Sequence, residues 1–159
     1  MGQNKRISAI AFAVMMLISG CSKPDEDNNI NDTAGEMIMM DNKYVQVIRS
    51  DGYISVCFDI ENDEIMEIGN RLNEVEEQAY MNGYNWDALI GYYVNANAPE
   101  LLVGFESDPE AGMYSGYYDN NDENMAKAEK LSDCILKMIE DPDGLCEFVS
   151  DNCEDIPWD

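Results

Sequence analysis

The spacing of apolar residues changes along this chain, and that change constrains the fold more than any other feature. Between Tyr53 and Ile60, apolar residues alternate with smaller or more polar ones, which is the period-two pattern of a strand with one buried face. From Asn62 onward, apolar residues recur at the spacing of an amphipathic helix. The same succession returns after Pro99. Strands are therefore expected over 44–49, 53–60, 101–106 and 113–118, and helices over 62–81, 86–96, 121–140 and 142–149.

Strand pairs thus alternate with helix pairs in the order ββααββαα. This order predicts a single α+β domain, in which an antiparallel sheet of about four strands carries its helices on one face. Ser50-Asp51-Gly52 contains the Asp-Gly pair that favours a hairpin turn. The segment 108–112 contains Asp, Pro and Gly and is expected to connect the second strand pair.

The N-terminus has the pattern of a secretory signal. Lys5 and Arg6 precede an apolar run of about 12 residues, and small residues follow it. The run is too short to span a membrane, which needs about 20 residues. Ile18-Ser19-Gly20-Cys21 resembles the lipobox of bacterial lipoproteins, in which the cysteine is acylated and becomes the new N-terminus. An ordinary signal peptide with an incidental cysteine is the alternative.

This interpretation divides the chain into three parts. Residues 1–20 are a lipoprotein signal peptide that is removed, residues 21–36 are the lipidated Cys21 and a disordered acidic tether, and residues 37–159 are the folded domain. Two or three acyl chains would anchor the protein durably, because one chain alone binds only marginally. We therefore expect a protein in the cell envelope, held by lipid on the extracytoplasmic side of a membrane.

The charge balance restricts the partners. The chain carries 33 acidic and 9 basic residues, for a net charge of −24. Removing residues 1–20, which hold Lys5 and Arg6 and no acid, changes this value by two, to −26. Nucleic acid is excluded as a favoured partner because its binding needs a basic surface. A basic protein would be attracted, and the alternative is that the acidity only keeps the domain soluble.

No feature of the sequence indicates an enzyme, a cofactor or a metal. The absence of histidine excludes Ser-His and Cys-His catalysis and His-ligated metal sites. No spacing among the carboxylates indicates a particular catalytic pair. The segment 119–124, Asp-Asn-Asn-Asp-Glu-Asn, is superficially like a calcium loop. It lacks the glycine and glutamate that an EF-hand requires, and a capped helix start is the simpler interpretation.

Four cysteines remain after lipidation, and an oxidising compartment allows them to pair. Three connectivities are open, and free thiols are the alternative. Cys146 and Cys153 lie where the chain is expected to fold back after its last helix, which would leave Cys57 to pair with Cys134.

Two strings in the middle of the chain resemble the Immunity protein 51 family. The first is Gly83-Tyr84-Asn85-Trp86, and the second is Asp108-Pro109-Glu110-Ala111-Gly112-Met113. The resemblance covers roughly residues 44–149. It implies an α+β protein encoded beside a polymorphic toxin, which protects the producing cell. Gly83, Gly112 and Pro109 suit turns, so the matched positions are expected to be scaffold.

The partner-binding residues are expected at the end of the last strand. Tyr117 and Tyr118 are adjacent on it, so one of them must face away from the core. Asp119, Asp122 and Glu123 follow and would form an acidic rim. The sequence thus predicts a membrane-anchored, non-enzymatic immunity protein that binds a basic toxin domain. The alternative is a surface lipoprotein that binds cations or envelope components.

Replacing Cys21 by serine tests the anchor. Because the thiol is the acylation site, Cys21→Ser should yield an uncleaved precursor or a soluble product instead of a lipid-bearing band. Membrane fractionation and mass spectrometry of the N-terminus make the measurement. A processed, lipid-bearing Cys21→Ser protein would contradict the lipobox.

Overall fold

The computed structural model describes residues 37–159, and the expected signal peptide, Cys21 and the tether lie outside the described residues. The elements follow the chain in the order β1 (Met37–Asp41), β2 (Val45–Arg49), β3 (Tyr53–Phe58), α2 (Asp63–Val75), α3 (Gly83–Asn97), the 3-10 helix η1 (Pro99–Leu102), β4 (Glu106–Ser107), β5 (Tyr114–Asp119), α4 (Asp122–Glu140) and α5 (Pro142–Asn152).

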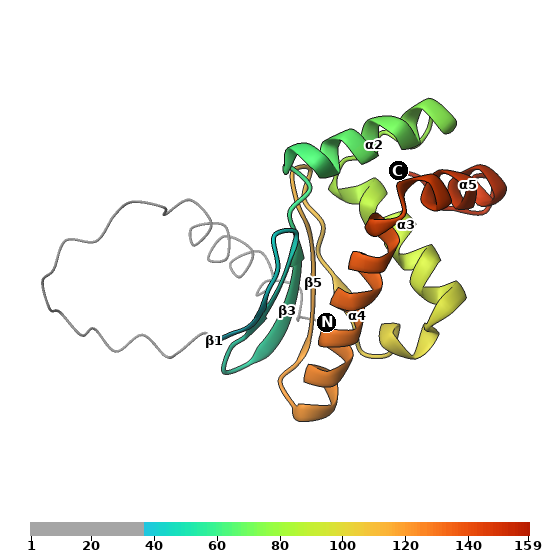
Figure 1. The fold of residues 1–159 in the computed structure, drawn as a ribbon. Coiled ribbons are helices and arrows are strands. Elements are labelled where there is room, and N and C mark those ends of the chain that lie inside the picture. Colours follow the sequence, from blue (N-terminus) through green and yellow to red (C-terminus); the bar gives the residue numbers. More distant parts are fainter. Residues whose placement is uncertain (1–36) are drawn as a thin grey trace, which may run out of the picture. The chain divides into compact units, whose positions relative to one another are not determined.

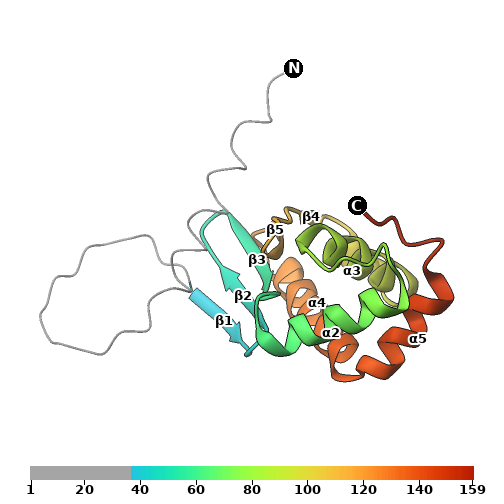
Figure 2. The same ribbon diagram turned by 90° about the horizontal axis from the view of Figure 1, so that it is seen from above.

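The strands form one antiparallel sheet in the order β1-β2-β3-β5-β4. The helices lie on one side of this sheet, with α4 packed along β2, β3 and β5 (Figures 1 and 2). The α+β class and the helix-covered face are therefore confirmed. β1 adds an edge strand that the periodicity did not predict.

The register of the strands explains the core. Val47 lies opposite Val56, and Val56 lies opposite Gly116, so one row crosses three strands on the helix-covered face. Among the described residues, the buried apolar side chains of this core run from Val45 to Ile156 and fill the space between the sheet and the helices. Within residues 37–159, no helix is long and apolar enough to cross a membrane.

Side-chain caps fix where the helices begin. Asn62, Asn82, Asn121 and Asp141 each accept a hydrogen bond from a backbone N–H in the first turn of the helix that follows, at 2.8–3.1 Å. This is the usual role of Asn and Asp at a helix start.

Two expected elements differ from the structure. α2 ends at Val75 rather than near 81, and α3 begins at Gly83 rather than at 86. Of the expected strand over 101–106, residues 101 and 102 lie in the 3-10 helix η1, residues 103 and 104 form a turn, and only the last residue joins the two-residue strand β4. Pro99 stands at the first position of η1, where its fixed φ favours a helical turn. Leu101 is buried, so this turn packs against the core.

The turn before β5 packs directly against the first residue of α3. The backbone N–H of Gly83 donates to the carbonyl of Ala111 at 3.1 Å. A Cβ at Gly83 would lie 1.8 Å from the carbonyl oxygen of Glu110 and 2.5 Å from that of Met113. Glycine is therefore required here by close approach. We call this contact the Gly83 junction.

The Gly83 junction also positions Trp86, the largest fully buried side chain of the core. Trp86, one turn further along α3, is 1% exposed. Its ring meets Phe58 of β3 edge-on, with centroids 5.1 Å apart. Such pairs add to the energy of burial itself. The junction thereby links the last strands to the sheet through α3.

Replacing Gly83 by alanine should destabilise the fold strongly. The added Cβ must push a backbone carbonyl away, and overpacking of this kind costs roughly 3 kcal/mol. Gly52→Ala is the matched control, because nothing lies within 4 Å of its Cβ position and its φ is not left-handed. The free energy of unfolding in urea should change by less than about 0.5 kcal/mol in the control. Equal stability of the two variants would show that the turn before β5 moves away from α3 at little cost in free energy.

Candidate functional site

Tyr117 and Tyr118 point to opposite faces of the sheet. Tyr118 is fully buried under the helices, where its hydroxyl donates to the carbonyl of Leu101 at 2.5 Å. Its ring packs against Phe105 with centroids 5.0 Å apart, and burial raises the pKa of its phenol well above the ordinary value. Only Tyr117, on the face away from the helices, is placed to contact a partner.

Tyr117 is held in position by its neighbours across the sheet. It lies opposite Glu106 of β4 and Ser55 of β3. Its hydroxyl donates to the carboxylate of Glu106 at 3.1 Å, and its ring meets Tyr53 edge-on at 6.4 Å. Desolvation, with the nearby Glu106 carboxylate, raises the pKa of Tyr117 to about 12. Tyr117 is therefore a neutral donor at any physiological pH.

Of the three acids expected around Tyr117, one belongs to this face. Asp119 is exposed and lies opposite Tyr53 in the register, and it forms no ion pair within residues 37–159. Asp122 and Glu123 are in the first turn of α4 and are paired with Arg49 at 3.1 Å and Lys127 at 3.5 Å. We call the set Tyr53, Glu106, Tyr117 and Asp119 the tyrosine face.

The sequence could not have indicated the whole tyrosine face. Tyr53 was visible as a residue on the strand face opposite Ile54, but its nearness to Tyr117 depends on the register between β3 and β5. Glu106 was expected at the end of a strand, and its place beside Tyr117 depends on the register between β4 and β5. Residues separated by more than 60 positions meet here, and no local spacing encodes that.

The segment 119–124 forms the start of α4. The side chain of Asn121 accepts from the backbone N–H of Asn124, and the side chain of Asn124 donates to the carbonyl of Asp119 at 2.9 Å. These bonds are those of a capped helix start. Between residues 37 and 159, no group of three or more acidic or thiol side chains is placed to hold a metal ion.

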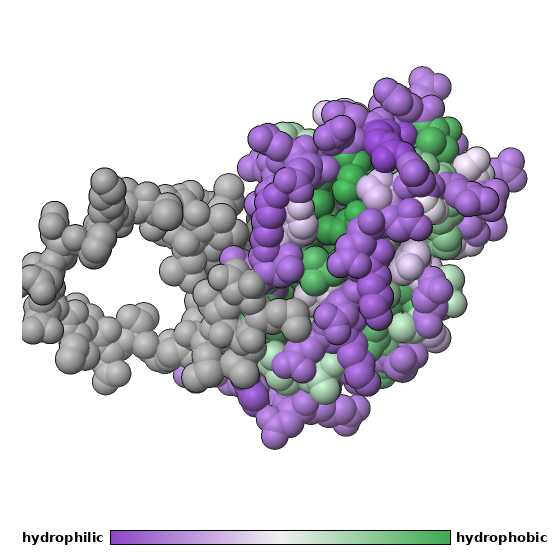
Figure 3. All heavy atoms as spheres, viewed as in Figure 1, coloured by the Kyte–Doolittle hydropathy of each residue, from purple (hydrophilic) through white to green (hydrophobic). Residues whose placement is uncertain are grey.

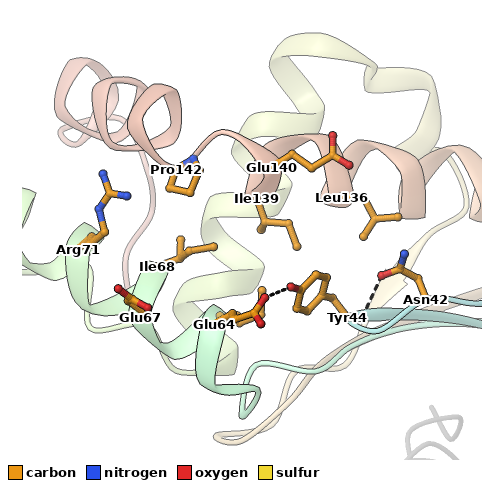
Figure 4. Close-up of a pocket in the computed structure, with 11 residues that line it drawn as sticks. Asn42, Tyr44, Glu64, Glu67, Ile68, Arg71, Leu136, Ile139, Glu140 and Pro142 are labelled. Carbon is orange, nitrogen blue, oxygen red and sulfur yellow. Dashed lines mark hydrogen bonds between the residues drawn. The ribbon is translucent and has the colours of Figure 1, made fainter.

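A groove of about 420 Å³ lies between α2 and the junction of α4 with α5. Ile65, Ile68 and Ile139 form its apolar base, and Figure 4 shows Ile68 and Ile139 pointing into the space between the helices. Apolar atoms are exposed among hydrophilic residues on this side of the domain (Figure 3). No local pattern indicates this groove, because its walls come from three separate helices and from the segment before β2.

The rim of this groove carries charges of both signs. Glu64 accepts hydrogen bonds from Lys43 and Tyr44, which lower its pKa (Figure 4). Arg71 pairs with Asp143. These two cations weaken the attraction of the rim for a basic partner. The tyrosine face, where Asp119 is unpaired, is the stronger candidate for such a partner.

The strings at 83–86 and 108–113 meet at the Gly83 junction. The hydroxyl of Ser115 donates to the carbonyl of Asp108, and the backbone N–H of Asp108 donates to the carbonyl of Ser115, each at 2.8 Å. A Cβ at Gly112 would lie 2.9 Å from the carboxylate of Glu61. Trp86 is buried, whereas Tyr84 is exposed, at 44%, as are Glu110, Ala111 and Gly112. The two strings thus form a packing junction around the start of α3.

The expected disulfides are wrong, because the thiols of Cys134, Cys146 and Cys153 are free. α5 continues to Asn152, so Cys146 and Cys153 are separated by about 10 Å along a helix axis, whereas a disulfide needs Cα atoms within about 7 Å. Cys57 and Val56 are neighbours on β3, so their side chains point to the two different faces of the sheet. α4, which carries Cys134, packs on the face of Val56. The sheet therefore separates the second pair.

Comparison with known proteins gives one match. The family model described as Immunity protein 51 matches residues 45–152, which is most of the described domain. The searches of curated proteins and of solved structures returned no significant match.

The free thiols can be tested by alkylation and by unfolding with and without a reductant. In the mature protein, denatured without reductant, an alkylating reagent should modify Cys134, Cys146 and Cys153, and intact mass should show it. Because no disulfide closes a loop through these residues, a reductant should leave the midpoint of urea unfolding unchanged. Loss of a native disulfide would instead cost about 2–5 kcal/mol, so a reductant-dependent midpoint would contradict the structure.

Proposed function

Because the chain belongs to the Immunity protein 51 family, we propose that it is a membrane-tethered immunity protein that binds a cognate bacterial toxin and neutralises it by occlusion. The inhibition requires no catalysis, only a stable complex that covers the toxin's working surface. The observation that supports this mode best is the tyrosine face, a rigid surface with an unpaired carboxylate.

The tyrosine face has the composition of a protein interface. Tyr53 and Tyr117 lie on paired strands and support each other edge-on, so little side-chain freedom is lost when a partner covers them. Tyrosine is enriched among the residues that dominate binding energy. Glu106 and Asp119 surround the rings with acceptors for basic donors.

The charge of the chain supports a basic toxin domain. Lys43, Arg49, Arg71 and Lys127 are each paired with a carboxylate, yet the chain has 33 acids against 9 basic residues. Most carboxylates therefore remain without an internal cation, and their combined field attracts a basic partner.

The lipobox-like string Ile18-Ser19-Gly20-Cys21 supports a membrane tether. An inhibitor must meet its toxin where the toxin acts or enters. We therefore place the encounter in the cell envelope, with a toxin that attacks the envelope or is intercepted while it crosses. A lipoprotein that binds cations is less favoured, because the segment 119–124 uses its side chains to cap α4.

Kinetics against the toxin domain encoded by the neighbouring gene test this function. Tyr117→Ala should raise the dissociation rate roughly 30-fold, the effect of losing about 2 kcal/mol at a central anchor. Tyr80→Ala is the matched control, since Tyr80 is 72% exposed but lies outside the tyrosine face. The double variant Glu106→Gln/Asp119→Asn should slow association at low salt and flatten its salt dependence.

A second double variant tests whether association depends on the charges of the tyrosine face or only on the net charge of the protein. Glu74→Gln/Glu129→Gln removes the same charge from exposed positions on α2 and α4 and should slow association less. Equal effects of the two pairs would show that the tyrosine face is not the docking site. No complex with the toxin domain at any salt concentration would overturn the immunity function itself.

A further inference from the structure

A cavity of about 490 Å³ opens between α3, strand β4 and the chain's last residues. It is separate from the groove between α2 and α4, and Figure 2 shows β4 beside α3. Its wall is mostly apolar, with Phe105 and Tyr114 among the aromatic members. Two carboxylates, those of Asp87 and Asp155, also line it.

Asp87 is a half-buried carboxylate whose charge no cation of the described domain compensates. Its one hydrogen bond comes from the hydroxyl of Ser107, at 3.2 Å. Burial raises the pKa of Asp87, which shows that the carboxylate is held where its charged form is poorly solvated. A cation entering the cavity would relieve this cost.

Gly91 of α3 lines the cavity without a side chain. It lies in the middle of α3, where glycine is less stable than alanine because its backbone is more flexible in the unfolded chain. Nothing outside its own helix backbone lies within 4 Å of its Cβ position, so packing does not require a glycine. Gly69 of α2 differs, because its Cβ would lie 3.0 Å from Met81. With Ala88 on the same wall, Gly91 leaves room for an incoming chain.

The aromatic wall is fixed in place. The ring of Phe105 lies directly over Gly116, whose added Cβ would be 2.1 Å from the ring. Phe105 also packs against the ring of Tyr118, with 5.0 Å between centroids. A guanidinium group combines well with such a site, since it stacks on aromatic rings and donates two hydrogen bonds to a carboxylate.

We propose that this cavity receives an arginine side chain of the protein partner, with the guanidinium bound to Asp87 and the aliphatic part against the aromatic wall. The proposal rests on the proposed function, because it names a contact of the same partner. Ser107, next to Asp87, follows Glu106 of the tyrosine face in the two-residue strand β4. One partner can therefore cover the tyrosine face and insert an arginine beside the edge of the sheet.

Small probes test the cavity without the toxin. N-acetyl-arginine amide should bind the protein and shift the backbone amide NMR signals of Gly91 and Ser107 in a saturable way. N-acetyl-citrulline amide, which replaces the guanidinium by a neutral urea of the same shape, should bind at least about tenfold more weakly, as expected for loss of a charged hydrogen bond.

Three variants locate the site. Asp87→Asn keeps an acceptor for Ser107 and should weaken arginine binding about tenfold or more while leaving citrulline binding unchanged. Gly91→Met should fill the cavity and abolish binding of both probes. Gly91→Ala should fold more stably than the wild type and still bind, which controls for the change of backbone.

The outcomes separate the two proposals. Equal binding of the arginine and citrulline probes, or full binding by Asp87→Asn, would overturn the arginine site and leave the immunity function standing. If the wild-type protein binds the arginine probe but forms no complex with the toxin domain, the immunity function is contradicted instead. Retained arginine binding in a folded Gly91→Met protein would place the probe elsewhere and also overturn the site.

Discussion

At Gly83 the backbone of α3 lies against the turn that leads into β5, closer than any side chain would permit. Much of the domain's arrangement depends on this contact. It sets the start of α3, which carries Trp86 into the core against Phe58. It also fixes the turn that precedes β5, and through the pairing of β4 with β5 it positions Glu106 beside Tyr117.

The same contact relates the two candidate binding features. The tyrosine face lies on the side of the sheet opposite the helices of residues 37–159, and the cavity of Asp87 lies on the other side of β4, against α3. Both are held by rigid backbone contacts, so a partner would meet them already formed. A preformed surface loses less conformational entropy on binding, which favours a tight inhibitor.

Charge has little part in holding this fold together. The four ion pairs of the described domain are exposed or partly exposed, and such pairs contribute at most about 1 kcal/mol each. The excess of carboxylates instead repels itself and makes the isolated domain less stable. A basic partner would neutralise part of this repulsion, so stability and association are linked through the same charges.

The local patterns predicted much of the fold. The helix from Asn121 to Glu140 was predicted nearly to the residue, because its cap and its apolar spacing are properties of neighbouring residues. The segment 101–106 was predicted as a strand but begins as the end of a 3-10 helix and continues as a turn, since burial of Leu101 and the bond from Tyr118 outweigh its strand-like composition. β1 was missed because its membership of the sheet depends on pairing with β2.

The sequence by itself thus determined the α+β class, the helix caps, the acidic surface and the need for one of Tyr117 and Tyr118 to face away from the core. These follow from periodicity and charge, which act over a few residues or over the whole composition. Only the tertiary structure decided that Tyr117 is the outward residue, that Glu106 joins it, and that Cys146 cannot reach Cys153. Those outcomes depend on strand register, helix length and close approach between distant segments, which are set when the whole chain packs.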